Sequence, residues 1–396
     1  MPGLLVLLVS GHLVVTAASR IGLRFGLTPT VVGLTVVAAG TSAPELAVVF
    51  QAIAADDTEL AVGSIIGSNI ANVLLVLGVV AGLGAITVTS RVVRADIPVM
   101  IAASVAFLVL AADGRLGRLD GALLLSGLAV FVGRTLYSGS RARARADQDR
   151  DQRQIVVGGG FGSIGRAKKR NDGERTGPLA VLVRSMDRLP VAIAALGVGV
   201  AGLALAARLV VTGAEAIAVG LGVPELIVGL TVVAIGTSAP EIVTTVIAAM
   251  RGRRDLAVGN AVGSNIFNIL LVLGGPTVLT GGISIGDDAL RLDLPILVAA
   301  AVACLPMVFW DHRLDRWEGL VFVGYYLAYL AFLVLDATGS RIRDPFAVVI
   351  IGFVVPLTVL TGVVAVRRHR AVHGNRRYVN PDDLPLQRRQ PTVVSQ

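Results

Sequence analysis

Long apolar runs separated by short polar segments follow one another along most of the 396-residue chain. Each run is long enough for a helix to cross the hydrocarbon core of a bilayer, which takes about 20 apolar residues. The first half of the chain contains five of them, at residues 3–25, 28–55, 60–84, 96–112 and 119–137. The second half contains five more, at residues 190–220, 224–250, 255–280, 293–310 and 317–335, and residues 345–366 form an eleventh. The pattern predicts an all-α membrane protein that crosses the bilayer many times.

The two halves of the chain are copies of each other. GLTVVAAGTSAPEL at residues 33–46 aligns with GLTVVAIGTSAPEI at residues 229–242, an offset of 196 residues (241 − 45). At the same offset, GSIIGSNIANVLLVLG from Gly63 aligns with GNAVGSNIFNILLVLG from Gly259. Looser matches follow, RADIP with RLDLP and DGRLGRLDG with DHRLDRWEG. Because each copy contains an odd number of spans, we expect the copies to cross the membrane in opposite directions, an arrangement typical of secondary transporters.

This repeat defines the expected domain organisation. A first repeat of five helices covers residues 1–137, and an inverted second repeat covers residues 190–335, giving a ten-helix core. Residues 138–189 are polar and basic, with RARARADQDRDQRQ, and are predicted to be a disordered cytoplasmic linker. Residues 336–366 add an extra transmembrane helix, and residues 367–396 form a basic cytoplasmic tail.

The charges of the loops predict how the chain is oriented in the plasma membrane. Loops rich in Lys and Arg stay in the cytoplasm, so the basic linker and the basic C-terminus are placed there. Counting back five spans from the linker then places the N-terminus outside. The other loops agree: the basic ones would lie inside (Arg20, Arg24, Arg91, Arg94, Arg251, Arg253 and Arg254) and the acidic ones outside (Asp56, Asp57, Glu59, Asp287 and Asp288).

The composition supports a membrane protein and excludes some chemistry. The chain is 54% hydrophobic and 16% charged, with a mean hydropathy of +0.78, whereas soluble domains are about 45–50% apolar and about 25% charged. The net charge of +8 is concentrated in loops and in the tail, so the expected partner is the lipid bilayer and not nucleic acid. The single cysteine, Cys304, excludes an internal disulfide.

The motif GTSAPE lies within an apolar run in each half, at residues 40–45 and 236–241. Pro44 and Pro240 lack an N–H group and disrupt the helix, which frees carbonyl groups such as those of Ala38 and Thr41. Irregular backbone at this depth is tolerated only where it is buried in protein or lines a wet cavity. Glu45 and Glu241 lie near the middle of their spans, where a carboxylate costs several kcal/mol and should have a partner.

Polar stripes on the third and eighth spans can supply partners for these glutamates. Ser64, Ser68 and Asn72 are spaced by four residues, and so are Asn260, Ser264 and Asn268, so each set lies on one helix face. Two carboxylates, several hydroxyls, amide oxygens and freed carbonyls suit a Ca²⁺ shell of about 6–8 oxygens. Two negative charges also balance a divalent cation in a low-dielectric site.

GTSAPE together with GSNIxN, present twice, resembles the paired α-repeats of the cation/Ca²⁺ exchanger superfamily, which includes the sodium/calcium exchangers. The resemblance covers both halves and implies ten core spans, with ion sites built from the second, third, seventh and eighth, and a gate formed by the first and sixth. It implies that Ca²⁺ binds Glu45, Glu241 and the carbonyls of Thr41 and Thr237. The Na⁺ sites that it implies use Ser42, Ser68, Ser238, Ser264, the carbonyls of Ala38 and Ala234, and the central Asn72 and Asn268.

The predicted function is antiport of Ca²⁺ against Na⁺ by alternating access, without a cofactor. Some sodium/calcium exchangers carry an Asp where this chain has Asn268, so antiport driven by protons, or dependent on K⁺, stays open as an alternative. A passive Ca²⁺ channel is less well supported, because channels usually assemble acidic rings from several subunits. An intramembrane protease, using the two carboxylates as a dyad, fits the surrounding Ser and Asn oxygens less well. We therefore expect a transporter and not an enzyme.

Two further acidic residues, Asp96 and Asp293, each precede a proline by two positions at the start of a span. Helix capping is the expected role of both.

Overall fold

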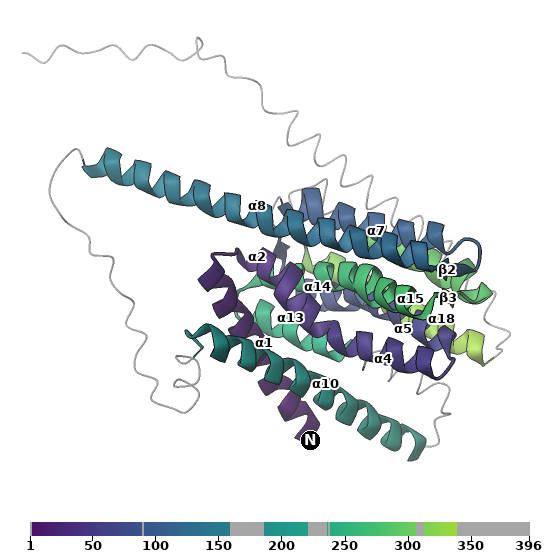
Figure 1. The fold of residues 1–396 in the computed structure, drawn as a ribbon. Coiled ribbons are helices and arrows are strands. Elements are labelled where there is room, and N and C mark those ends of the chain that lie inside the picture. The colour runs from purple at the N-terminus through teal and green to yellow at the C-terminus, as the bar shows by residue number, and fades with distance from the viewer. Residues whose placement is uncertain are drawn as a thin grey trace, which may run out of the picture.

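The computed structural model describes residues 2–88, 91–158, 186–220, 236, 238–305 and 313–338. Eight helices among these residues are long and apolar enough to cross a membrane, and the apolar helix Ala239–Met250 is shorter. Figure 1 shows them running side by side in one bundle, which is an all-α membrane architecture. The predicted extra span, the tail and residues 221–235 of the seventh span lie outside the described residues.

The first half forms five spans close to the predicted positions. The first is α1 (Pro2–Phe25), and the last is α8 (Arg118–Gly158). The second is divided into α2 (Pro29–Val32), η1 (Gly33–Val37), α3 (Ala38–Thr41) and α4 (Ala43–Ala54). The third contains α5 (Thr58–Ala71), η2 (Asn72–Leu77) and α6 (Gly78–Leu83), and the fourth contains η3 (Val92–Asp96) and α7 (Ile97–Leu110). The segments named η are π-helical turns, a wide geometry that is uncommon and often occurs at functional sites.

The second half repeats this order. Its first span is α10 (Leu189–Gly220), and the described part of the next is α13 (Ala239–Met250). The eighth span contains α14 (Arg254–Phe267), η5 (Asn268–Leu273) and α15 (Gly274–Thr280). It is followed by η6 (Ala289–Asp293), α16 (Leu294–Val302) and α18 (Arg316–Ala337). The π-helical turns η2 and η5 begin at Asn72 and Asn268, which are equivalent positions of the two repeats.

Helix α8 differs from the prediction for the linker. It continues to Gly158, whereas the sequence predicts disorder from Ser138 onward. Residues 140–154 contain neither Gly nor Pro and are rich in Ala, Arg and Gln, which are good helix formers. High polarity argues against a buried core but not against a helix, and α8 accordingly extends into the segment for which disorder is predicted.

Asp96 and Asp293 also differ from the prediction. Neither side chain caps a helix, because the backbone is already helical at both residues, with φ/ψ of −84°/−40° and −71°/−41°. Each lies at the end of a π-helical turn, η3 or η6, that runs into the next α-helix. A wider turn before a proline relieves the clash between its ring and the carbonyl one turn back, so the helix continues through the position where a cap was expected.

Two short antiparallel strand pairs join the halves. β1 (Ile86–Thr87), after the third span, pairs with β4 (Arg313–Leu314), before the tenth. β2 (Arg115–Gly117), before the fifth span, pairs with β3 (Gly282–Ser284), after the eighth. In the repeat alignment β1 corresponds to β3 and β2 corresponds to β4. β1 therefore pairs with the counterpart of β2, and β2 pairs with the counterpart of β1. This exchange of partners requires the two repeats to have opposite orientations.

Glycines allow the helices of the two halves to approach closely, and they do so symmetrically. A Cβ on Gly319 of α18 would lie 2.6 Å from the carbonyl oxygen of Gly78, and a Cβ on Gly121 of α8 would lie 2.9 Å from that of Gly274. Gly259 of α14 meets the second span in the same way, since its Cβ would lie 2.7 Å from the carbonyl oxygen of Thr30. The eighth span is 94% buried, so it forms the centre of the bundle.

We expect Gly319→Ala to destabilise the protein, because the added methyl group would meet backbone that cannot move away without separating α18 from α6. Overpacking of this kind costs about 1–3 kcal/mol, which should lower the melting temperature in detergent by at least about 2 °C. Gly324→Ala is the matched control on the same helix, since a Cβ there has no described atom within 4 Å. Equal melting temperatures for the two variants would contradict the close approach.

Candidate ion-binding site

The helix breaks caused by the two GTSAPE motifs place both glutamates. The chain leaves regular helix at Ser42 (φ/ψ −82°/−1°) and at Ser238 (−86°/5°), and a new helix starts one residue later in each half. Pro44 and Pro240 lie in the first turns of α4 and α13, where a missing N–H group costs little. Glu45 and Glu241 lie in the same turns, where the helix dipole favours negative charge.

Glu45 and Glu241 meet in the interior of the bundle. Their exposed fractions are 2% and 0%, and each carboxyl group is close enough to interact with the other. Within the described part of the chain, none of their four oxygens has a partner in a well-formed hydrogen bond. Two facing carboxylates in a low-dielectric interior repel each other strongly, so the site requires a cation or protons.

Polar side chains of the second, third and eighth spans contact one another, and Thr41 among them also interacts with Glu241. Thr41 Oγ1 lies 3.3 Å from Ser264 Oγ and 3.4 Å from Asn260 Oδ1, which joins α3 to α14. Asn268 Nδ2 donates to Ser68 Oγ at 3.1 Å, which joins η5 to α5. The structure thus brings the polar stripes of the two halves together at one place.

Several oxygens at this place are buried and have no hydrogen-bond partner among the described residues. They belong to the hydroxyls of Ser42, Ser64 and Ser238 and to the amides of Asn72 and Asn268. The carbonyl oxygen of Ala38 differs, since it accepts from Ser42 N at 2.9 Å and from Thr41 Oγ1 at 3.4 Å. Ala234 and Thr237 lie outside the described residues. Buried polar atoms are rarely left unpaired, so the unpaired serine and asparagine oxygens are the ones available to a ligand.

Thr244 and Thr245 are polar residues of this region that the sequence analysis missed. Asn260 Nδ2 donates to Thr245 Oγ1 at 2.9 Å and to Thr244 Oγ1 at 3.2 Å, which orients the amide. Their spacing of three and four residues from Glu241 places them on its helix face, and this signal was available from the sequence. The equivalent residues of the first half are Val48 and Val49, so the site is not symmetric.

The chemistry of the site is that of hard oxygen ligands. No group of three or more His, Cys, Asp or Glu residues that could hold a metal occurs among the described residues. A cation at the glutamate pair would therefore complete its shell with neutral hydroxyl, amide and carbonyl oxygens. Such ligands are typical of Ca²⁺ and are not those of softer transition metals.

Two repeats of opposite orientation with a buried polar site between them form an architecture typical of a secondary transporter. The sequence profile described as "Sodium/calcium exchanger protein" matches residues 2–137 and 191–335, more than half of the chain. The chain therefore belongs to the sodium/calcium exchanger family, whose members are ion transporters and not enzymes.

Individual relatives agree with this assignment. The chain is 35% identical over 333 residues to the inner membrane protein YrbG of Escherichia coli, covering 84% of this chain and 94% of that protein. It is 31% identical over 343 residues to the sodium/calcium exchanger MaX1 of Methanosarcina acetivorans, covering 84% of this chain and 96% of that one. A structure of the sodium-calcium exchanger NCX_Mj, soaked with Na⁺ and Ca²⁺, superposes with a TM-score of 0.64 at 25% identity, covering 83% of this chain and 95% of that one.

We expect Glu241→Gln to stabilise the protein when no cation is present, because it removes one of two facing buried carboxyl groups that must either repel each other as charges or take up a proton. At pH 8.5 in a chelator and without Na⁺, the melting temperature of this variant should exceed that of the unmodified protein by about 2–4 °C for each kcal/mol gained. The control is Glu59→Gln, which changes an exposed glutamate at the end of the bundle. A Glu241→Gln variant that melts no higher than the Glu59→Gln control would show that burial of the pair does not cost stability.

Proposed function

We propose that the chain exchanges Ca²⁺ for Na⁺ across the membrane by alternating access at the Glu45–Glu241 pair. The observation that carries this proposal is the meeting of two buried carboxylates whose oxygens have no described partner. Ca²⁺ would bind this pair together with the carbonyls of Thr41 and Thr237. Family membership supports exchange of these ions, and the relatives MaX1 and NCX_Mj are both sodium/calcium exchangers by name.

The Na⁺ positions belong to the same proposal. Ser42, Ser68, Ser238 and Ser264 would supply hydroxyl oxygens, Ala38 and Ala234 would supply carbonyls, and the central Asn72 and Asn268 would supply amides. The unpaired hydroxyls of Ser42 and Ser238 and the unpaired oxygens of Asn72 and Asn268 support these roles. The carbonyl of Ala38 already accepts two hydrogen bonds, so Na⁺ at this position requires Thr41 to turn away.

Electrostatics explains why such a site exchanges ions and does not leak. With Ca²⁺ or several Na⁺ bound, the carboxylates are neutralised, and the site can pass from one side of the membrane to the other. An empty site leaves two bare charges in a medium where each costs several kcal/mol. The transition of the empty transporter is therefore suppressed, and each crossing is coupled to an ion.

The orientation predicted from the loop charges is part of the proposal, with the N-terminus outside and the C-terminus in the cytoplasm. Contacts among the basic loops support it. Arg253 hydrogen-bonds Ser19, near the end of the first span, and Arg254 Nη1 donates to the carbonyl of Ala85, after the third, at 2.8 Å. The positive charges of three loops thus gather at one end of the bundle, as cytoplasmic ends require.

Proton-driven exchange is the second candidate, and the same glutamate pair favours it. Two facing buried carboxylates can be neutralised by protons as well as by cations. Asn72 and Asn268 are both amides, so the centre of the site holds only the two glutamate charges among the described residues. K⁺ could also be carried along with Ca²⁺.

One uptake experiment tests these alternatives. Uptake of ⁴⁵Ca²⁺ is measured with the purified protein in sealed vesicles that contain Na⁺ only inside. Gradients of K⁺ and of pH are then imposed separately. We expect the outward Na⁺ gradient alone to drive uptake, and Glu45→Gln and Glu241→Gln each to lower the initial rate at least about 100-fold, because either change leaves Ca²⁺ with a single carboxylate. The Glu59→Gln variant should transport normally.

Uptake that is driven by a pH gradient in Na⁺-free buffer and does not respond to Na⁺ would show that the coupling ion is the proton and not Na⁺. Uptake that persists in either glutamine variant would remove the glutamates from the mechanism.

A further inference from the structure

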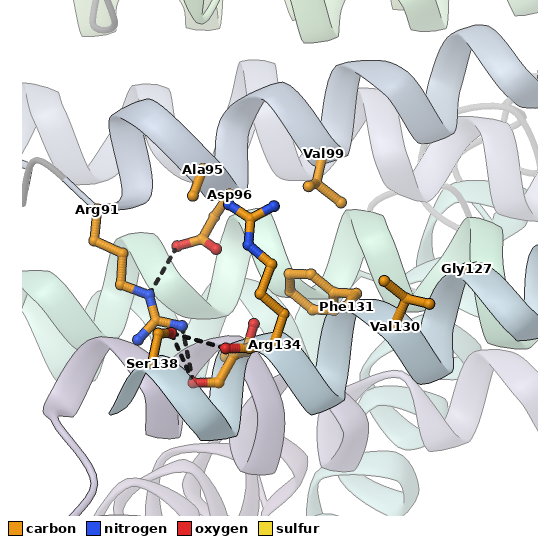
Figure 2. A pocket seen from close by; sticks show the side chains of 10 residues that line it. Arg91, Ala95, Asp96, Val99, Gly127, Val130, Phe131, Arg134 and Ser138 are labelled. Atoms are coloured by element: carbon orange, nitrogen blue, oxygen red, sulfur yellow. Dashed lines mark hydrogen bonds and ion pairs between the residues drawn. The ribbon is translucent and has the colours of Figure 1, made fainter. Parts of the chain in front are cut away.

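A cavity of about 180 Å³ lies between η3 and α7 on one side and α8 on the other, far along the chain from the glutamate residues. Figure 2 shows Asp96 between the guanidinium groups of Arg91 and Arg134, with Phe131 and Val130 beside them. The cavity has room for a group of several heavy atoms. Its walls carry two positive charges, one negative charge and an apolar surface.

Asp96 has an unsatisfied acceptor in this cavity. Its side chain is 4% exposed, and its Oδ2 lies 3.9 Å from Nε of Arg91, beyond hydrogen-bond distance. Within the described part of the chain, this oxygen has no hydrogen-bond partner. A buried carboxylate oxygen without a donor is costly, so the cavity should admit a group that supplies one.

The second repeat shows how the protein satisfies the equivalent carboxylate. Asp293, which aligns with Asp96 through RLDLP and RADIP, accepts a hydrogen bond from Tyr329 Oη at 3.3 Å. The residue that aligns with Tyr329 in the first repeat is Phe131, which lacks the hydroxyl. In the second repeat a tyrosine hydroxyl donates to the aspartate. In the first repeat this hydroxyl is missing, so a ligand would have to supply the donor for Asp96.

The two arginines are placed to bind an anion next to this carboxylate. Arg91 Nη2 donates to the carbonyl of Thr135 at 3.0 Å, which fixes its side chain across the cavity. Arg134 lies within electrostatic range of both Asp96 and Arg91. The aligned positions of the second repeat are Asp288 and Phe332, so the positive charges, like the unsatisfied carboxylate, belong to the first repeat. Guanidinium groups are well suited to phosphate.

The opening of the cavity points to lipid. The span Arg118–Gly139 is only 22% buried, and Val130 beside the cavity is 69% exposed. Arg91 adjoins one end of the span Val92–Leu110, and Arg134 lies near the end of its own span, so the charged groups are at headgroup level while Val130 faces the acyl chains.

We propose that this cavity binds the headgroup of a phosphatidylethanolamine molecule from the bilayer. Arg91 and Arg134 hold its phosphate, its ammonium group donates to Asp96, and one acyl chain lies along Val130. The zwitterion matches the two positive charges and one negative charge of the walls. Phosphatidylcholine has the same charges, but its quaternary ammonium has no N–H to donate, and phosphatidylglycerol has hydroxyl donors without the positive charge.

Native mass spectrometry of the delipidated full chain in detergent tests this proposal, with the three lipids at equal concentration and with matched acyl chains. We expect phosphatidylethanolamine to bind at least about tenfold more tightly than phosphatidylcholine, because only its ammonium group can hydrogen-bond Asp96. Equal affinity for the two lipids would overturn the proposal, and so would a preference for phosphatidylglycerol.

Phe131→Tyr is the sharpest variant, because it gives the first repeat the hydroxyl that the second already has. It should reduce the preference for phosphatidylethanolamine over phosphatidylcholine to about one, with an unchanged melting temperature as the check on folding. Asp96→Asn should do the same, and Arg134→Gln should weaken binding of both lipids. Arg94→Gln is the matched control, since Arg94 is exposed on η3 and does not line the cavity.

An unaltered preference in Phe131→Tyr would contradict the assigned position of the ammonium group. Soluble glycerophosphoethanolamine identifies the source of the headgroup. It should not displace the lipid at equal concentration, because it cannot use the apolar opening. Displacement by this compound would overturn the assignment to a membrane lipid.

Discussion

Repulsion between two carboxylates buried against each other is the constraint around which this structure is arranged. Glu45 and Glu241 come from different repeats, and the interior offers their oxygens no described partner. A folded chain can hold such a pair only if a cation or a proton regularly neutralises it. Neutral hydroxyl and amide oxygens of this region, several of them also unpaired, can supply the rest of a coordination shell without adding charge. Stability and ion binding therefore depend on the same atoms.

The inverted repeat solves the problem of bringing two such groups to one depth. Each GTSAPE motif breaks its helix at a serine and starts a new one, so each glutamate occupies the first turn of a helix within the bilayer. Opposite orientation of the halves then makes these two helix starts face each other. Two departures from this symmetry change the polar contacts of the halves. Thr244 and Thr245 orient Asn260 in one half only, and Phe131 replaces a tyrosine in the other.

Much of the fold could be predicted from the sequence, because long apolar runs and an exact duplicated motif are strong signals. The two glutamates could also be predicted, since a carboxylate at mid-membrane requires a reason. The π-helical turns at Asn72 and Asn268 could not, because NVLLVL and NILLVL are ordinary helical sequences that carry no signal of the wider geometry. The backbone at Asp96 and Asp293 could not be predicted either. The capping rule assumes that a helix starts at the proline, whereas here the helix is continuous through both aspartates.

The two strand pairs each take one strand from each repeat, and this makes the halves depend on each other. A single repeat on its own would have two strands with exposed backbone edges and no partner for either, because its own β1 and β2 lie at opposite ends. In this chain each of these edges is covered by a strand of the oppositely oriented repeat, so neither half completes its strand pairs without the other.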